Sequence, residues 1–246
     1  MWGKTLCAAA AACVYAFTFS GFAEAMSVSP VQVEMTSAGS ASRGQVTVRN
    51  TSDKPLPVET SLQGLQLDAK GARKLSPAGE DFLVFPPQAM IPAGATQVFR
   101  LQWVGDPALA KGKSYMFTVS EVPVKLPKGQ NNVQIVMGFG VVIDVAAAGV
   151  TPSLNIVSTK ITKDKQGQQH AILTVENPTN THALLPDGSI NLSGEGWSKT
   201  LTSADLRQTI GIGLVQPGMR RRFVLPVIVP ASVTNLQVSL DYRPKH

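Results

Sequence analysis

The chain has 246 residues, a formal net charge of +6 and two cysteines, Cys7 and Cys13. Both cysteines lie in an N-terminal segment that we expect to be removed, which excludes thiol catalysis, thiolate metal sites and a disulfide scaffold from the mature chain. The basic residues are scattered, and the only tight run, 220–222, follows turn residues and is typical of a solvated strand end. Because no aromatic residues alternate with the basic ones, we expect no nucleic-acid partner.

Residues 1–25 have the features of a secretory signal peptide. Lys4 gives a positive start, residues 5–19 are apolar, and residues 23–25 (AEA) supply a small-x-small cleavage site. The apolar stretch is too short for a membrane span. A retained anchor or a lipoprotein is the alternative, but neither cysteine follows the apolar core as a lipid-attachment cysteine would. Cleavage would leave 221 of the 246 residues, enough for one large or two ordinary domains.

The first half of the remaining chain predicts a β-sandwich. Short runs rich in Val, Ile, Thr and aromatic residues are separated by clusters of Gly, Pro, Asn and Asp, and helical periodicity is nearly absent. Seven strands in about 120 residues make one sandwich domain, which we place at 26–147. We expect the strands at 28–35, 44–50, 56–66, 82–85, 96–103, 114–122 and 132–146.

The second half predicts another sandwich, at 148–246. Residues 146–152 (AAAGVTP) have no alternation and indicate a joint between domains. A strand that runs into an Asn-led turn occurs at 48–53 and again at 175–180, which suggests two sandwiches of the same kind. A helical turn is expected near 203–207. The strands are expected at 153–162, 169–177, 188–193, 207–214, 221–229 and 235–242.

The sequence offers little support for catalysis. His170, His182 and His246 are too far apart for a local metal motif, and no nucleophile elbow, phosphate loop or His-Glu-x-x-His is present. The Gly-x-Gly pairs at 138–140 and 211–213 lie inside expected strands, where glycine more often permits close backbone approach than binds a dinucleotide. We therefore expect no catalytic residue, no metal and no cofactor.

The stretch 131–145 (NNVQIVMGFGVVIDV) is the most informative part of the chain. From Val133 to Val145 every second residue is apolar, which is typical of a half-buried strand. Thirteen residues at about 3.3 Å each span roughly 43 Å, longer than the core of a domain of this size. Part of the row should therefore overhang the core or lie at an edge. An exposed apolar edge is a pairing hazard, so its presence points to a partner that needs a strand.

The order of these pieces resembles the PapD-like periplasmic chaperones of pilus assembly. The similarity rests on an Asn-terminated strand (46–50), a Pro-Pro and Pro-x-Gly segment (85–94), the strand 98–101, and 114–123 (SYMFTVSEVP) followed by the alternating strand. Residues 176–179 (ENPT) carry it into the second half, so that it covers 27–242. The Tyr-x-Phe-x-x-x-Glu-x-Pro stretch with its following strand is the most specific part.

The resemblance implies an all-β fold of two immunoglobulin-like sandwiches in a boomerang arrangement, located in the periplasm. In that family the last strand of the first domain is lent to an incomplete pilus subunit, which is donor-strand complementation. The subunits are then passed to an outer-membrane usher. The residues that would fill the subunit's groove are Val133, Ile135, Met137, Phe139 and Val141.

Two features of the family pattern are missing from the sequence. An arginine in the first strand and a lysine late in the donor strand hold the subunit's terminal carboxylate in that family, but these positions fall near Pro30 and on Val142. Arg100 is the nearest basic replacement in sequence, with an ordinary structural ion pair as its alternative. A long donor row without these anchors is similar to the archaic branch of the family.

The predicted function is therefore non-enzymatic: capping of pilus subunits and delivery to an usher. An exported structural or adhesive pilus component is the alternative, although the chain lacks the N-terminal donor extension and cysteine pair of a pilin. A secreted hydrolase would need a catalytic constellation that the sequence does not show. The apolar edge also predicts a self-capping homodimer when no subunit is bound.

Overall fold

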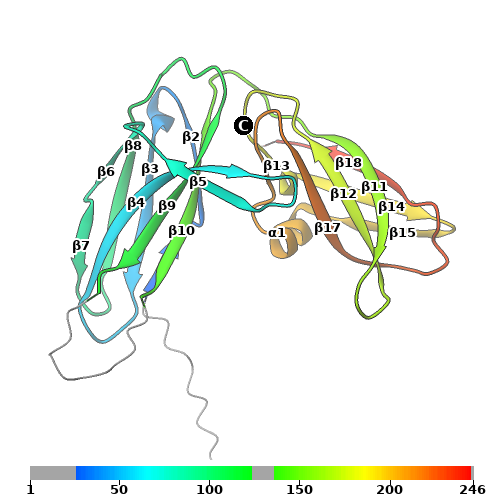
Figure 1. Ribbon diagram of the computed structural model, residues 1–246, viewed down its shortest axis with the longest axis horizontal. Helices are drawn as coiled ribbons and strands as arrows, with labels where there is room; N and C mark the ends of the chain where they lie inside the picture. Colours follow the sequence, from blue (N-terminus) through cyan, green and yellow to red (C-terminus); the bar gives the residue numbers. More distant parts are fainter. Residues whose placement is uncertain (1–25, 124–135, 245–246) are drawn as a thin grey trace, which may run out of the picture.

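The computed structural model describes residues 26–123 and 136–244, which form two β-sandwiches that meet at an angle (Figure 1). Each sandwich has its own buried apolar cluster, one built from residues 26–145 and the other from residues 154–233. The fold is therefore all-β with two immunoglobulin-like domains, as the sequence predicts. The predicted signal peptide lies outside the described residues.

The first domain packs a four-stranded sheet, named sheet I, against a six-stranded sheet, named sheet II. Sheet I has the order β1 (Met26–Ser29), β3 (Arg43–Asn50), β8 (Thr96–Trp103) and β6 (Phe82–Phe85). Sheet II has the order β2 (Gln32–Thr36), β10 (Gly138–Ala146), β9 (Lys113–Glu121), β4 (Leu56–Leu67) and β5 (Arg73–Pro77), and β7 (Gln88–Ile91) also pairs with β4. A 3-10 turn, η1 (Ser40–Ser42), precedes β3.

Aromatic side chains fill much of the space between these sheets. Phe99 and Phe117 are fully buried, with ring centroids 6.4 Å apart. At the end of the domain that faces the second domain, Phe82 packs edge-on against Trp103 and Tyr115, at 5.2 and 5.0 Å between centroids. Such pairs add stability beyond the buried area.

The second domain is built from smaller sheets. One has the order β11 (Asn155–Lys163), β12 (Gln169–Glu176) and β17 (Arg220–Val229), and another has the order β15 (Trp197–Leu201), β14 (Gly188–Gly194) and β18 (Gln237–Tyr242). The short pair β13 (Ala183–Leu184) and β16 (Leu214–Val215) lies at the side that faces the first domain. η2 (Leu185–Asp187) and α1 (Ser203–Ile210) complete the domain.

The same asparagine corner is built in both domains. The side-chain amide of Asn50 donates to the backbone C=O groups of Lys54 and Ile91, and its oxygen accepts from the backbone N–H and hydroxyl of Ser52. The side chain of Asn177 makes the matching bonds to Thr181, Val215 and Thr179. Both asparagines are fully buried, so each corner satisfies its polar groups internally.

The structure corrects three of the predicted elements. The single strand expected at 28–35 is two strands, β1 and β2, which belong to different sheets. The strand expected at 207–214 is wrong, because Thr202 and Asp205 form a capping box that starts α1 and only β16 follows it as a strand. The strand expected at 132–146 begins at Gly138 within the described residues, since Val136 and Met137 are outside β10 and residues 132–135 are not described.

Candidate functional site: the open edge of β10

Strand β10 has a strand partner on both sides along only part of its length. β9 pairs with it from Gly138 to Val145, whereas β2 pairs with it only from Val142 onward. β2 reaches no further because the chain crosses near Pro30 into sheet I, where β1 pairs with β3. No described strand pairs with the outer side of Gly138–Val141. This open edge is a template onto which another chain can add a strand.

Backbone groups along β10 point alternately to its two sides. The N–H of Val142 donates to the C=O of Val31 on the β2 side, at 3.0 Å, and the C=O of Met137 accepts from Glu121 on the β9 side, at 2.9 Å. By this alternation, the N–H and C=O groups of Gly138 and Gly140 face the open side. These four groups are the ones that a partner strand would bind.

The apolar row leaves the domain's own core within the same stretch. Ile143 and Val145 are fully buried and Val141 is 1% exposed, all within the first core cluster. Phe139 is only partly buried against that cluster, and Met137 is half-buried. The side chain of Val141 therefore packs in the domain's own core in this structure, and its expected contact with a subunit stays a prediction. Val133 and Ile135 lie outside the described residues.

The covered half of β10 carries a buried carboxylate. Asp144 is fully buried, and its two oxygens accept from the Ser114 hydroxyl of β9, at 2.6 Å, and from the Gln32 amide of β2, at 3.0 Å. Burial raises the pKa of Asp144, although His182 and these two hydrogen bonds oppose the rise. The carboxyl group thus links three adjacent strands on the side of sheet II that faces the second domain.

A histidine of the second domain completes this polar cluster. His182 is 8% exposed, and its Nε2 lies 3.7 Å from Oε2 of Glu34 on β2. Burial alone would lower the pKa of His182, but Glu34, Asp144 and Asp187 raise it and the net shift is upward. Protonation of His182 therefore strengthens an electrostatic contact between the domains. No role for His182 could be predicted from the sequence, because the strands that carry its partners are distant from it along the chain.

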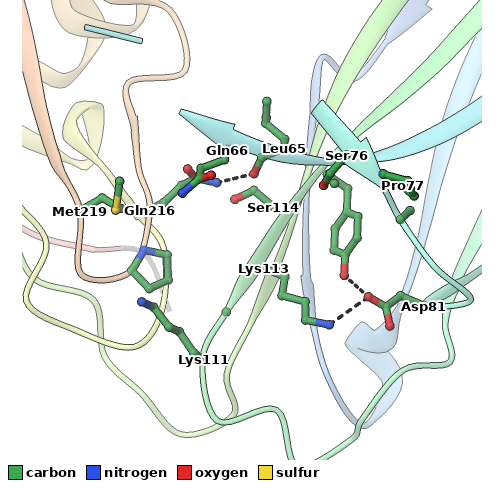
Figure 2. Close-up of a pocket in the computed structure, with 15 residues that line it drawn as sticks. Leu65, Gln66, Ser76, Pro77, Asp81, Lys111, Lys113, Ser114, Gln216 and Met219 are labelled. Carbon is green, nitrogen blue, oxygen red and sulfur yellow. Dashed lines mark hydrogen bonds and ion pairs between the residues drawn. The ribbon is translucent and has the colours of Figure 1, made fainter. Parts of the chain in front are cut away.

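A glutamine of the second domain binds the backbone of β4. The Gln216 amide donates to the C=O of Leu65 at 2.8 Å (Figure 2). Its oxygen accepts from the N–H of Leu67, also at 2.8 Å. This pair of bonds imitates a neighbouring strand. Next to it lies an apolar cluster shared by the two domains, consisting of Leu65, Leu67, Met116, Val142, Leu184 and Leu214. The covered half of β10 is thereby tied to the second domain through Val142.

A hollow of about 380 Å³ lies between the β4–β5 hairpin, the start of β9 and the Gln216–Met219 turn. Figure 2 shows the residues that line it. Lys111 and Lys113 line it, and Lys113 Nζ lies 3.0 Å from the Asp81 carboxylate. The Tyr115 hydroxyl donates to the same carboxylate, and burial together with Asp81 raises the pKa of Tyr115. In the strand order β10-β9-β4 this hollow lies on the far side of β9 from the open edge.

The structure does not bring Arg100 to β10. Arg100 lies on β8 in sheet I and is exposed to solvent on its outer face, whereas β10 belongs to sheet II. Val142, where the family pattern expects a lysine, is opposite Gln32 in the β10–β2 register, and Asp144 is opposite Glu34 two residues further along. The β2 end of the open edge is therefore bounded by carboxyl groups and one histidine.

The described residues contain no group of three or more His, Cys, Asp or Glu side chains that could hold a metal ion. Nε2 of His170 lies 3.1 Å from a carboxylate oxygen of Asp164 in its own hairpin. No helix in the described ranges is long and apolar enough to cross a membrane.

The fold defines a class of proteins built from two immunoglobulin-like sandwiches, and here the first sandwich has an open strand edge. Residues 25–142 match the sequence model of the family described as pili and flagellar-assembly chaperone, PapD N-terminal domain. The N-terminal domain is therefore similar to that of PapD-like pilus-assembly chaperones. No curated protein sequence matches the chain significantly.

Solved structures of fimbrial chaperones are similar to 80–89% of this chain. The YadV chaperone is 17% identical, with 88% of this chain and 92% of that one covered and a TM-score of 0.52, which shows a shared fold. The class 5 fimbriae chaperone CfaA is 12% identical over 89% and 100% of the two chains, with a TM-score of 0.49. The CsuC–CsuE chaperone–tip adhesion subunit complex of Acinetobacter baumannii is 14% identical over 80% and 89%, with a TM-score of 0.48.

Proposed function

We propose that this protein is a periplasmic chaperone that binds and caps pilus subunits by donor-strand complementation. The observation that carries the proposal is the open half of β10. There the outward backbone groups have no described strand partner, and the apolar row extends beyond the domain's core. The similarity of the N-terminal domain to that of pilus-assembly chaperones supports the same role. The reaction is one of binding and folding, without covalent chemistry.

The proposed binding mode uses two kinds of contact. A subunit strand would hydrogen-bond to the backbone groups of Gly138 and Gly140, while Met137 and Phe139 enter the subunit's groove. Val133 and Ile135 would continue the row. Each such side chain contributes roughly 1.5–3 kcal/mol when fully buried, before the cost of ordering the strands. Because the side chain of Val141 already packs in the chaperone's own core, we propose that it does not enter the subunit's groove and that only its backbone forms part of the donor strand.

The proposal extends to the cellular setting. Pilus-assembly chaperones act in the periplasm, and the predicted signal peptide at 1–25 would direct the chain there. We further propose that the capped subunit is handed to an outer-membrane usher. Without a subunit, the open edge would pair with a second copy of the chain, which predicts a dimer that dissociates when a subunit binds.

The test is a pull-down from the native periplasm with tagged chaperone, with captured proteins identified by mass spectrometry. Phe139→Asp places a charge in the proposed row. Val136→Asp is the matched control, because Val136 is 47% exposed and lies three residues away with the opposite strand parity. Circular dichroism establishes that both variants are folded.

We expect β-rich pilus subunits with the wild type and with Val136→Asp, and none with Phe139→Asp. Capture of the same subunits by folded Phe139→Asp would contradict the donor-strand proposal. Light scattering over a range of concentrations tests the dimer, and a strictly monomeric protein at high concentration would contradict that part alone.

A further inference from the structure

The outer face of one sheet in the second domain carries exposed apolar side chains. In the sheet β11-β12-β17, the odd-numbered residues of β17 from Phe223 onward pack in the second core cluster, whereas the even-numbered ones face solvent. Val224 is 56% exposed and Ile228 is 57% exposed. Single exposed apolar residues are common on protein surfaces, but these two share one face of one strand.

Basic side chains lie on the same face as these apolar groups. Lys160 of β11 is opposite Ile172 of β12, and Ile172 is in turn opposite Val224 of β17. Residues directly opposite each other in an antiparallel pair point to the same face, so the three side chains form one row across the sheet. Arg222 lies two residues from Val224 along β17 and belongs to the next row. Both Lys160 and Arg222 are exposed.

The charge of this sheet is not balanced within the sheet. Its only acidic residue, Glu176, is already paired with Arg220, whose Nη2 lies 3.3 Å from a carboxylate oxygen. Neither Lys160 nor Arg222 forms a salt bridge within the described part of the chain. The basic residues of the three strands are Lys160, Lys163, Arg220, Arg221 and Arg222.

The tip of the β4–β5 hairpin brings another cation to the edge of this sheet. The backbone N–H of Arg222 donates to the C=O of Ala69, at 2.7 Å. Lys70 follows Ala69 in the chain and is exposed. Its backbone is held in a turn by Asp68, whose carboxylate accepts from the N–H groups of Lys70 and Ala72. Two basic segments that are far apart in sequence therefore meet beside the apolar row.

We propose that the outer face of the β11-β12-β17 sheet is a docking site for an anionic phospholipid surface. Lipid phosphates pair with Lys160 and Arg222, while Val224 and Ile228 enter the boundary between the head groups and the acyl chains. Cations without partners beside an apolar row match a surface that has an anionic layer above an apolar one. Because the face belongs to the second domain, the proposal does not depend on the donor role of β10.

The test is co-sedimentation with lipid vesicles, using protein purified from the periplasm so that the predicted signal peptide is absent. One set of vesicles mixes phosphatidylglycerol with phosphatidylcholine, and the other contains phosphatidylcholine alone. The variants are Arg222→Gln and Val224→Ser. The matched controls are Arg49→Gln, at an exposed position of β3 in the first domain, and Val104→Ser, at a position that is 46% exposed. Circular dichroism establishes that every variant is folded.

We expect the wild type to bind the vesicles with phosphatidylglycerol and not the neutral ones. Arg222→Gln should weaken binding by about fivefold and reduce its salt dependence, because one contact with lipid phosphate is lost. Val224→Ser should weaken it by about threefold to tenfold, because an apolar side chain no longer enters the boundary. Arg49→Gln and Val104→Ser should each change binding by less than about twofold, since they remove the same groups from other faces.

An equal loss with Arg49→Gln and Arg222→Gln would overturn the proposal, because the net charge alone would then attract the protein to the vesicles. So would unchanged binding by folded Val224→Ser, or no binding at about 1 mM lipid. A soluble polyglutamate peptide forms a separate arm of the test. Binding to this peptide that Arg222→Gln weakens, without binding to vesicles, would assign the face to an acidic polypeptide instead.

Discussion

The two halves of β10 differ although they belong to one continuous strand. The half from Val142 to Ala146 pairs with strands on both sides, buries Ile143 and Val145, and carries Asp144 in a polar cluster. The half from Gly138 to Val141 pairs on one side only and has two glycines. The comparison shows how a strand can be fixed in its own domain and still present an edge: one half supplies the anchorage and the other the free backbone.

The largest expected difference between the halves concerns side-chain truncation. Ile143→Ala should lower the free energy of unfolding by about 2–5 kcal/mol, because Ile143 is fully buried in the core. Phe139→Ala should cost clearly less, since Phe139 is only partly buried, while abolishing subunit capture. Urea unfolding followed by circular dichroism measures both. Equal costs for the two substitutions would show that the halves are packed alike.

The second expected effect concerns the carboxyl group of Asp144. Asp144→Ala should cost about 1–3 kcal/mol at neutral pH, because the buried Ser114 and Gln32 donors lose their acceptor. Asp144→Asn should cost little, since the hydroxyl can rotate and the glutamine amide can flip to suit a neutral amide. Thermal unfolding of both variants measures this. A large loss with Asp144→Asn would mean that the negative charge itself is required.

The third prediction concerns the histidine that faces the covered half. The folded-state pKa of His182 is raised above its unfolded value, so its contribution is fully present below about pH 6.5 and is lost as the pH rises through the folded pKa. Stability should therefore fall as the pH rises from below about 6.5 through the raised folded-state pKa. His182→Gln should remove this slope, and urea midpoints at several pH values give the answer. An unchanged slope in His182→Gln would place its origin elsewhere.

The smallest effect on stability is expected for Gly138→Pro. Gly138 begins β10, and by the alternation described above its N–H faces the open side, so a proline removes no hydrogen bond to β9. We expect a change in unfolding free energy of less than about 1 kcal/mol and a clear loss of subunit capture, because the ring blocks the partner's ladder. Titration of purified subunit onto both proteins measures the loss. Undiminished binding would mean that the partner does not add as a strand here.

The architecture could be predicted from the sequence wherever a strand buries one face. The strand at 82–85 has the predicted bounds because an apolar run is bounded there by Asp81 and Pro86. The strand at 96–103 has the predicted bounds because Phe99, Leu101 and Trp103 alternate with polar residues. β5 was missed because all its residues are exposed and no alternation exists to be read. The division of 28–35 into two strands could have been predicted. The buried residue before Pro30, Met26, has an even number, whereas the buried residues after it, Val33 and Met35, have odd numbers. A change of parity at a proline indicates a strand that changes sheets.

The candidate site was predictable only in part, for a physical reason. The alternation from Val133 to Val145 is a local pattern, so the apolar row can be recognised from the sequence alone, and its role as a donor stays a prediction. The contacts of Asp144 are not local in the sequence. Its hydrogen bond to Gln32 joins residues more than 100 positions apart, and its electrostatic interaction with His182 reaches into the second domain. Likewise the sequence cannot show that Arg100 and β10 belong to opposite sheets, because that depends on strand order.

The hydrogen bonds between Gln216 and β4 restrict the motion of one domain relative to the other. Its two hydrogen bonds go to backbone groups of Leu65 and Leu67. They therefore depend on the path of the backbone and not on which side chains occupy these two positions. Turning one domain against the other breaks both bonds at once and exposes the shared apolar cluster. The molecule should therefore tumble as a single rigid body, and a calorimeter should record the melting of its two domains as one coupled event.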